Sequence, residues 1–379
     1  MKHKQWAAMG VVAMAAGAAC AQSSVTLYGV IDTGVERLSH VGGTSASVTR
    51  MPGQAGGFLP SRWGLRGSED LGNGLKALFV LESGFSPDKG TNNTNQGGRL
   101  FGRSAWVGLG GSWGQLSFGR QYTMYFWSLL DADPAGPMIY GLPSLDAGIP
   151  GSRSDNTMAY KGSFGGFTAG ATYSFGRDAS GVAAPAPSCA GEVAGDTKAC
   201  REFSLLAKYD AAQWGVALAH DEQRGGAGAA PGFTLSSLSD QRTLANGYVK
   251  IGAAKVGAGL IRRKNEAVTT TTVTPKSDLA YLEADYAFTP AFSLIGLVAR
   301  LKYKDSTDGS QSTVYALRGS YALSKRTAVY LVGGRMSNKG SANAGLSSGT
   351  IPTAADGGAT APGAGKGQSG FMMGVRHSF

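Results

Sequence analysis

The sequence predicts an all-β protein, a transmembrane barrel of 16 antiparallel strands. Three observations support this fold class. Apolar and polar residues alternate in segments along the whole chain, the connections between these segments alternate between short and long, and the last segment ends in an aromatic residue. After residue 21 there is no run of about 18 apolar residues, which excludes membrane-spanning helices.

The composition agrees with a β-rich chain whose apolar residues are dispersed. Glycine occupies 59 of 379 positions, and charged residues make up only 16%, against roughly 25% in an average soluble domain. Because 42% of residues are hydrophobic and 9% aromatic, disorder is unfavourable. Only 14 prolines accompany the glycines, and no three-residue period relates them, so collagen is excluded. The formal charge of +10 is scattered without a dense basic stripe, a weak signal for nucleic-acid binding.

The first 21 residues are typical of a secretory signal peptide. Lys2 and Lys4 precede an apolar stretch over 6–19, and the tripeptide 19–21 (Ala-Cys-Ala) is a cleavage site of the A-x-A type. A membrane anchor is the alternative, but the stretch is short and lacks a basic flank after it. We therefore expect residues 1–21 to be removed and residues 22–379 to form one barrel domain.

The period-two pattern is clear in the first segment of the expected mature chain. Val25, Leu27 and Ile31 share one face of a strand, whereas Tyr28 and Asp32 share the other. The same alternation recurs over 157–161, 203–209 and 280–288. Strands with one apolar and one polar face suit a barrel wall between lipid and water.

The connections fall into two classes by length. The short ones lie at 72–74, 110–112, 163–166, 210–212, 289–290 and 323–325, and the long ones at 39–58, 87–98, 122–152, 178–200, 223–240, 265–276 and 340–369. Short turns at one end and long loops at the other are typical of an outer-membrane barrel, and an even number of strands lets the last strand close against the first.

The end of the chain carries a further signal. Phe371, Met373, Val375, His377 and Phe379 lie on one face of a last strand. A terminal phenylalanine on such a strand resembles the assembly signal of outer-membrane barrels, and we assign that role to Phe379.

Two cysteines remain after removal of the signal peptide, Cys189 and Cys200. Because an exported chain matures in an oxidising compartment, a disulfide within one loop is expected. Its stabilisation of the loop would be about 3 kcal/mol in the chain-entropy model. Metal binding is the weaker alternative, since no histidine lies nearby.

The histidines argue against an outer-membrane enzyme. His40 and His220 lie outside any recognisable nucleophile or acid motif, although Asp221 follows the second. We therefore predict no catalytic, cofactor-binding or metal site. A secreted adhesin would share the β pattern but would not need the terminal phenylalanine.

Several segments resemble the Gram-negative general diffusion porins, especially their trimeric anion-selective β-proteobacterial branch. These segments run from the first strand to the last residue: 24–32, 61–77, 102–109, 117–123, 153–157 and 374–379. The resemblance implies a homotrimer in the outer membrane. It also implies a third external loop, here 122 to about 152, that folds into the channel and narrows it. The apolar segment 123–133 within it could form a short helix.

Alternation and resemblance together select residues for the channel constriction. Trp63 and Leu65 are expected to face lipid, so Arg62 and Arg66 should face the lumen. Arg153 is expected to face inward in the same way, together with Asp155 and Lys161, because Met158 and Tyr160 face outward.

The resemblance also places Arg103 inside the channel. Extending the alternation from Arg103 would put Ala105, Val107 and Leu109 on the lumen wall, as a seat for the infolded loop. The acids of that loop, Asp131 and Asp133, are expected to face the remaining opening, opposite the arginines.

The predicted function is passive diffusion of small hydrophilic solutes with a modest preference for anions. A charge about 8 Å from a passing anion in water contributes about 0.5 kcal/mol, so three unopposed arginines contribute about 1.5 kcal/mol, weakened by salt. Chloride, phosphate and small organic acids are all compatible with this prediction, and a solute-specific channel is the alternative.

Overall fold

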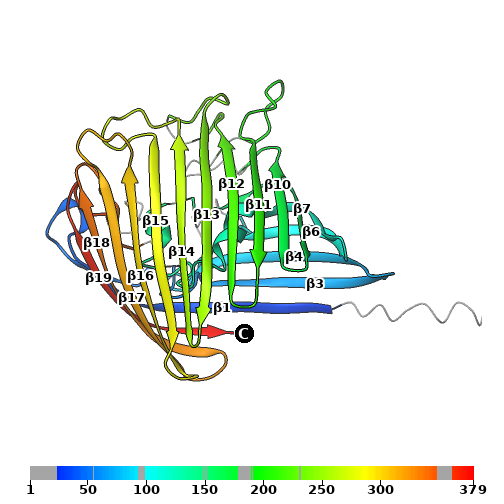
Figure 1. The fold of residues 1–379 in the computed structure, drawn as a ribbon, viewed down its shortest axis with the longest axis horizontal. Helices are drawn as coiled ribbons and strands as arrows, with labels where there is room; N and C mark the ends of the chain where they lie inside the picture. Colours follow the sequence, from blue (N-terminus) through cyan, green and yellow to red (C-terminus); the bar gives the residue numbers. More distant parts are fainter. Residues whose placement is uncertain are drawn as a thin grey trace, which may run out of the picture.

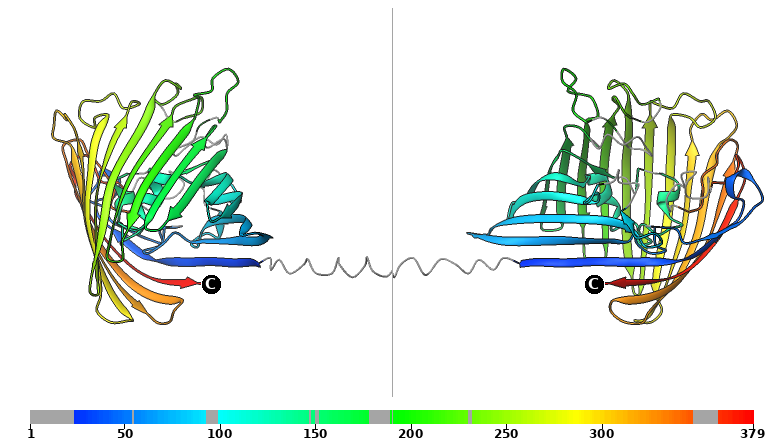
Figure 2. Two further views of the ribbon diagram at one scale, coloured as in Figure 1. Left: turned by 45° about the vertical axis from the view of Figure 1, so that its right-hand side comes forward. Right: turned by 180° about the vertical axis from the view of Figure 1, so that it is seen from behind.

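The computed structural model describes residues 24–53, 55–92, 99–146, 148–149, 152–177, 189, 191–229, 232–347 and 361–379. The predicted signal peptide, 1–21, lies outside them. Sixteen strands form a closed antiparallel barrel (Figures 1 and 2). The barrel strands are β1 (Ser24–Leu38), β3 (Arg62–Gly72), β4 (Leu75–Ser86), β6 (Ser104–Gly111), β7 (Gly114–Tyr122), β9 (Thr157–Phe164), β10 (Phe167–Ser174), β11 (Glu202–Asp210), β12 (Trp214–Arg224), β13 (Ser239–Ile251), β14 (Ala254–Asn265), β15 (Lys276–Ala287), β16 (Phe292–Tyr303), β17 (Gln311–Ala322), β18 (Thr327–Lys339) and β19 (Gln368–Ser378).

The remaining described elements are short and lie in the long connections. They are the strands β2 (Val48–Arg50), β5 (Thr91–Asn92) and β8 (Arg153–Ser154), the helix α1 (Met124–Leu129), and the 3-10 helices η1 (Val41–Gly43) and η3 (Leu142–Ser144). No helix in the described part of the chain is long and apolar enough to cross a membrane.

The barrel closes where the first strand meets the last. β1 pairs with β19 from Val30 opposite Ser378 to Leu38 opposite Gly370. Next to this ladder, Gly29 and Phe379 exchange two backbone hydrogen bonds of 3.1 Å each. β1 and β19 lie side by side (Figure 1), so closure leaves no free sheet edge, as a membrane-spanning sheet requires.

The two ends of the barrel differ as the sequence predicts. At one end the strands join through tight turns, and Gly72, Asn73 and Gly74 all adopt positive φ in the turn from β3 to β4. At the other end the long connections emerge. Two further connections, at 252–253 and 304–310, are not among those predicted from the sequence.

The outer face carries the apolar side chains that the alternation assigns to lipid. In β1, Leu27 is 58% exposed, whereas Asp32 on the opposite face is buried. In β6, however, Val107 and Leu109 are exposed on the outer face, so their predicted place on the lumen wall is wrong. Arg103 precedes the first residue of β6, and the alternation of the strand therefore does not extend to it.

Cys189 and Cys200 form the predicted disulfide, with their Cα atoms 5.7 Å apart. Both cysteines are buried. The backbone N–H of Cys200 donates to the carbonyl of Gly225, which ties this loop to the neighbouring connection after β12. The disulfide therefore lies among the long connections at one end of the barrel.

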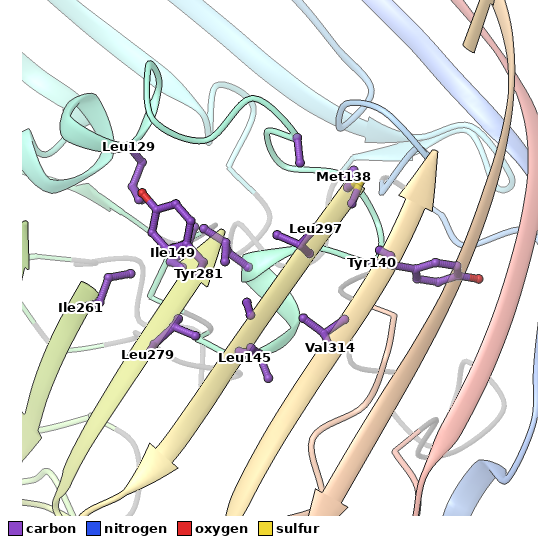
Figure 3. Close-up of a cluster of buried hydrophobic side chains, with 14 of the residues drawn as sticks. Leu129, Met138, Tyr140, Leu145, Ile149, Ile261, Leu279, Tyr281, Leu297 and Val314 are labelled. Carbon is purple, nitrogen blue, oxygen red and sulfur yellow. The ribbon is translucent and has the colours of Figure 1, made fainter. Parts of the chain in front are cut away.

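The third long connection, between β7 and β9, folds into the barrel as predicted. We call it loop 3. Its helix is shorter than the expected segment 123–133 and contacts β10, β11, β12 and β13. Further along, its buried apolar side chains pack against the inner face of the strands that follow (Figure 3). Those of loop 3 include Leu129, Met138, Tyr140, Leu145 and Ile149, and those of the barrel include Leu244, Ile261, Leu279, Tyr281, Leu297 and Val314.

Candidate functional site

Two of the predicted arginines, Arg62 and Arg103, lie beside the carboxylate of Glu82 in β4. Glu82 is not among the residues predicted from the sequence. The Nε of Arg103 donates to Glu82 Oε1 at 2.6 Å, and the Nε of Arg62 lies 3.4 Å from Oε2. The hydroxyl of Tyr28 donates to the same Oε2 at 3.0 Å. Glu82 therefore holds two guanidinium groups close together despite their like charge.

Strand register explains how Tyr28 reaches Glu82 across the intervening strand. Tyr28 lies opposite Gly64 of β3, and Gly64 lies opposite Glu82. A Cβ atom at position 64 would be only 2.8 Å from the Tyr28 oxygen. Glycine at this position leaves the space through which the two side chains meet.

Tyr122, the last residue of β7, joins a third arginine to this group. Its hydroxyl accepts hydrogen bonds from Arg103 Nη2 at 2.7 Å and from Arg153 Nη2. Arg153 lies opposite Tyr122 in the short ladder between β7 and β8, and its guanidinium carbon is 4.1 Å from the centre of the Tyr122 ring. Tyr122 also stacks on Phe126 of α1, which places the group inside the barrel beside loop 3.

We define the arginine wall as Arg62, Arg66, Arg103 and Arg153, together with Glu82. Arg66 is exposed, and its guanidinium carbon is 5.3 Å from the centre of the Tyr28 ring. Arg103 and Arg153 are only 6% and 7% exposed, so their hydrogen bonds hold them in fixed positions. Within the arginine wall, the guanidinium groups of Arg62 and Arg103 pair with Glu82.

The two acids of loop 3 lie away from the arginine wall. Asp131 forms an ion pair with Lys208 of β11, which also pairs with Asp210 at 2.8 Å. Asp133 is buried against the backbone of loop 3 and against Glu283 of β15, so the expectation that it faces the opening is wrong. Its Oδ1 accepts the backbone N–H of Gly136 at 2.7 Å, because the tight turn of the loop needs an acceptor there.

Asp133 lies beside Glu283 of β15, whose Oε2 accepts the backbone N–H of Ala135 at 2.9 Å. Burial raises the pKa of Asp133. Arg318 of β17 completes the attachment by donating to the carbonyl of Ala135 at 3.2 Å. The acids of loop 3 therefore fasten the loop to the barrel.

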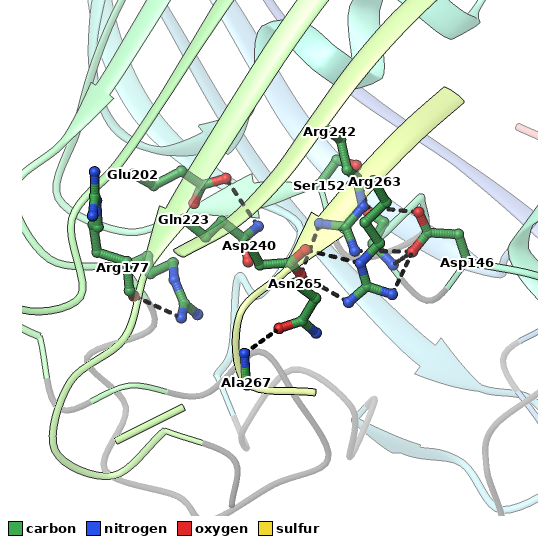
Figure 4. Close-up of polar contacts among 12 residues, drawn as sticks. Asp146, Ser152, Arg177, Glu202, Gln223, Asp240, Arg242, Arg263, Asn265 and Ala267 are labelled. Carbon is green, nitrogen blue, oxygen red and sulfur yellow. Dashed lines mark hydrogen bonds and ion pairs between the residues drawn. The ribbon is translucent and has the colours of Figure 1, made fainter. Parts of the chain in front are cut away.

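A second attachment follows further along loop 3, at Asp146. Its two oxygens accept from Arg242 of β13, with distances of 2.8 Å to Nε and 2.9 Å to Nη2 (Figure 4). Arg242 also pairs with Asp240, which binds Arg263 through both its oxygens at 2.8 Å. Although burial opposes ionisation, these two guanidinium groups hold the pKa of Asp146 well below its usual range. We call this group the loop clamp.

Asp155, which the sequence places inward beside Arg153, does not join the arginine wall. It pairs with Arg99 at 2.6 Å and with Arg120 at 2.7 Å. Arg120 shares its face of β7 with Phe118, which is 50% exposed on the outer surface. Asp155 precedes β9, so the alternation of that strand does not fix its direction.

A closed barrel narrowed by an infolded loop and lined by charges is a channel, and comparison with known proteins agrees. Residues 7–341 match the Gram-negative porin family. The chain belongs to this family. It is 31% identical to outer membrane porin protein 32 of Delftia acidovorans, over 99% of both chains. It is also 44% identical to an outer membrane porin protein of Bordetella pertussis, over 44% of this chain and 47% of that protein.

Solved structures show the same architecture. The anion-selective porin from Comamonas acidovorans superposes with a TM-score of 0.73 at 26% identity, covering 94% of this chain and all of that one. OmpT of Vibrio cholerae, at 14% identity and a TM-score of 0.64, shows the shared fold alone. This porin is therefore a diffusion channel of the Gram-negative outer membrane, and its relatives are channels rather than enzymes.

Proposed function

We propose that this porin passes small hydrophilic solutes with a modest preference for anions, set by the arginine wall. The observation that carries the proposal is the excess of guanidinium groups over carboxylates around Glu82. The acids expected to oppose them, Asp131 and Asp133, are engaged by Lys208 and by the backbone of loop 3. The related Comamonas structure is described as an anion-selective porin, which supports the same preference here.

The size of the preference follows from the charges. Glu82 offsets one of the three charges of Arg62, Arg66 and Arg103, which leaves two. At about 8 Å in water each contributes about 0.5 kcal/mol to a passing anion, or about 1 kcal/mol together. That corresponds to a roughly fivefold preference for anions at low salt. It describes selection during passage rather than tight binding.

The test is the reversal potential of the purified porin in a planar bilayer under a gradient of potassium chloride. We expect a potential of the sign that marks chloride as the more permeant ion, and a smaller one at high ionic strength because salt screens the arginine wall. A potential of the opposite sign would refute the anion preference. The absence of channels would count against passive diffusion itself.

We further propose that the exported chain loses residues 1–21, that residues 22–379 assemble as a homotrimer, and that Phe379 acts as the assembly signal. The pairing of Phe379 with Gly29 supports a role in barrel closure. Chloride, phosphate and small organic acids are all compatible with this proposal. Heating a sample before electrophoresis should convert a trimer band to a monomer band, and a monomer band without heating would refute the trimer.

A further inference from the structure

The helix of loop 3 presents an apolar face to the channel. Met124, Tyr125 and Leu129 are at most 3% exposed and pack against the barrel. Phe126 and Trp127 on the opposite face are only partly buried, and the adjoining Leu130 is 45% exposed. Free passage of hydrophilic solutes does not require large apolar side chains at a narrow point. Their exposure therefore indicates a contact surface.

Three aromatic rings and two cations form one group on this face. The rings of Tyr122 and Phe126 stack with centres 3.7 Å apart, and Trp127 meets both edge-on at 6.0 and 5.8 Å. The Nζ of Lys161 lies 3.6 Å from the centre of the Trp127 ring, and Arg153 lies over Tyr122. We call these five residues the aromatic–cationic patch.

The charges of the patch select the kind of molecule that the rings can hold. Lys161 forms no ion pair with a carboxylate in the described part of the chain, and the neighbouring lysine, Lys208, is paired with Asp131 and Asp210. Cationic solutes, which aromatic rings could otherwise attract, are repelled by Lys161. A simple inorganic anion would meet the cations but gain nothing from the rings.

We propose that the aromatic–cationic patch is a weak binding site for small aromatic carboxylates. The ring of such a solute would pack against Phe126 and Trp127, and its carboxylate would lie near Lys161. The inference rests on the proposed entry of anions into the channel and adds a substrate class to it. Weak binding suits a channel because a solute must also leave.

The test measures block of the chloride current through single channels by benzoate, cyclohexanecarboxylate and acetate. Benzoate should block at a concentration about fivefold lower than cyclohexanecarboxylate, because ring–ring contacts add to apolar burial, and acetate should be the weakest. Equal block by all three would overturn the inference while leaving the channel intact. Absence of chloride channels would overturn both the inference and the proposed function.

Two variants locate the site. Trp127→Leu keeps an apolar side chain against the barrel but removes the aromatic ring. It should abolish the stronger block by benzoate relative to cyclohexanecarboxylate. An unchanged chloride conductance would show that loop 3 is still in place. Lys161→Gln should weaken block by both ring carboxylates. Lys76→Gln, which removes an equal charge near the turn at 72–74, is the matched control. Equal effects of the two lysine variants, or unchanged benzoate block in Trp127→Leu, would contradict the assignment.

Discussion

The two halves of the inner wall differ in polarity although one sheet forms both. On the side of β3, β4 and β6, the inner face carries the charged side chains of Arg62, Glu82 and the neighbouring Arg103. On the side of β13 to β17, the inner face carries apolar residues such as Leu244 and Val314, both fully buried beneath loop 3. Beneath loop 3 the inner face also carries the buried charged side chains of Arg242, Glu283 and Arg318, each of which is bound to the loop.

This difference separates two properties of the channel. The apolar half and the loop clamp determine where loop 3 lies, and so the width of the opening. In the proposed function, the charged half sets which ions prefer to pass. Because the two sets of side chains are distinct, substitutions beneath loop 3 or in the loop clamp should change the width with little effect on selectivity. Substitutions in the arginine wall should change selectivity with little effect on the width.

The largest effect is expected from Asp146→Asn in the loop clamp. Removing one partner of a buried ion pair costs about 3–5 kcal/mol, and here it leaves the guanidinium groups of Arg242 and Arg263 to share Asp240 alone. Loop 3 should then fluctuate, which would appear as excess noise in single-channel recordings and as faster hydrogen exchange over loop 3. Unchanged exchange would show that the apolar contacts alone hold the loop.

The same clamp predicts a pH dependence. The folded-state pKa of Asp146 is lowered, so its stabilisation is fully present above the ordinary aspartate pKa of about 4 and is lost as the pH falls towards the folded value. The protection factors of the loop 3 amides, which correct for the intrinsic pH dependence of exchange, should fall below about pH 4 in the wild-type protein. The Asp146→Asn variant should show less of this decrease.

A somewhat smaller effect is expected from Leu279→Ala, in the apolar seat of loop 3. Leu279 is 1% exposed, and truncating such a side chain costs about 2–5 kcal/mol. Loop 3 should loosen and the mean conductance should rise. Leu282→Ala in the same strand is the control, because Leu282 is 51% exposed on the lipid-facing side. Equal conductance changes in both variants would show that Leu279 does not help to hold loop 3 in place.

The smallest effect concerns selectivity. Replacing Arg62 and Arg66 with Ser removes two charges, or about 1 kcal/mol, and should shift the reversal potential towards cations by about fivefold in permeability ratio. Glu82→Gln should shift it about twofold the other way. If the double variant leaves the potential unchanged, these arginines lie too far from the narrowest point to act on passing ions.

The sequence predicts the strands well because lipid on one side and water on the other impose alternation on each of them. In β3, apolar Trp63 and Leu65 mark the outer face, so the side on which Arg62 lies can be read directly. The alternation does not predict the directions of the Arg103 and Asp155 side chains. Both precede their strands, and a residue outside the ladder has no alternation to follow.

Other residues of the site, such as Glu82, could not be predicted from the sequence for a different reason. Glu82 lies in a segment, 75–86, with leucine, valine and phenylalanine on both faces, so alternation does not single it out. The inner faces of β13 to β17 carry apolar residues such as Leu279 because loop 3 covers them. The burial of Asp133 beneath that loop depends on Glu283, which lies far along the chain in β15. Such long-range contacts leave no local pattern.

The seam between β1 and β19 has a consequence for how this protein folds. Ser39 and Ser369, which hydrogen-bond beside it, are 330 positions apart, whereas the other ladders join strands that follow one another along the chain. Closing so long a segment carries a large entropic cost before any contact compensates it, so this ladder should form late. Until then two sheet edges remain open to other chains. A nascent barrel therefore needs its edges shielded throughout insertion.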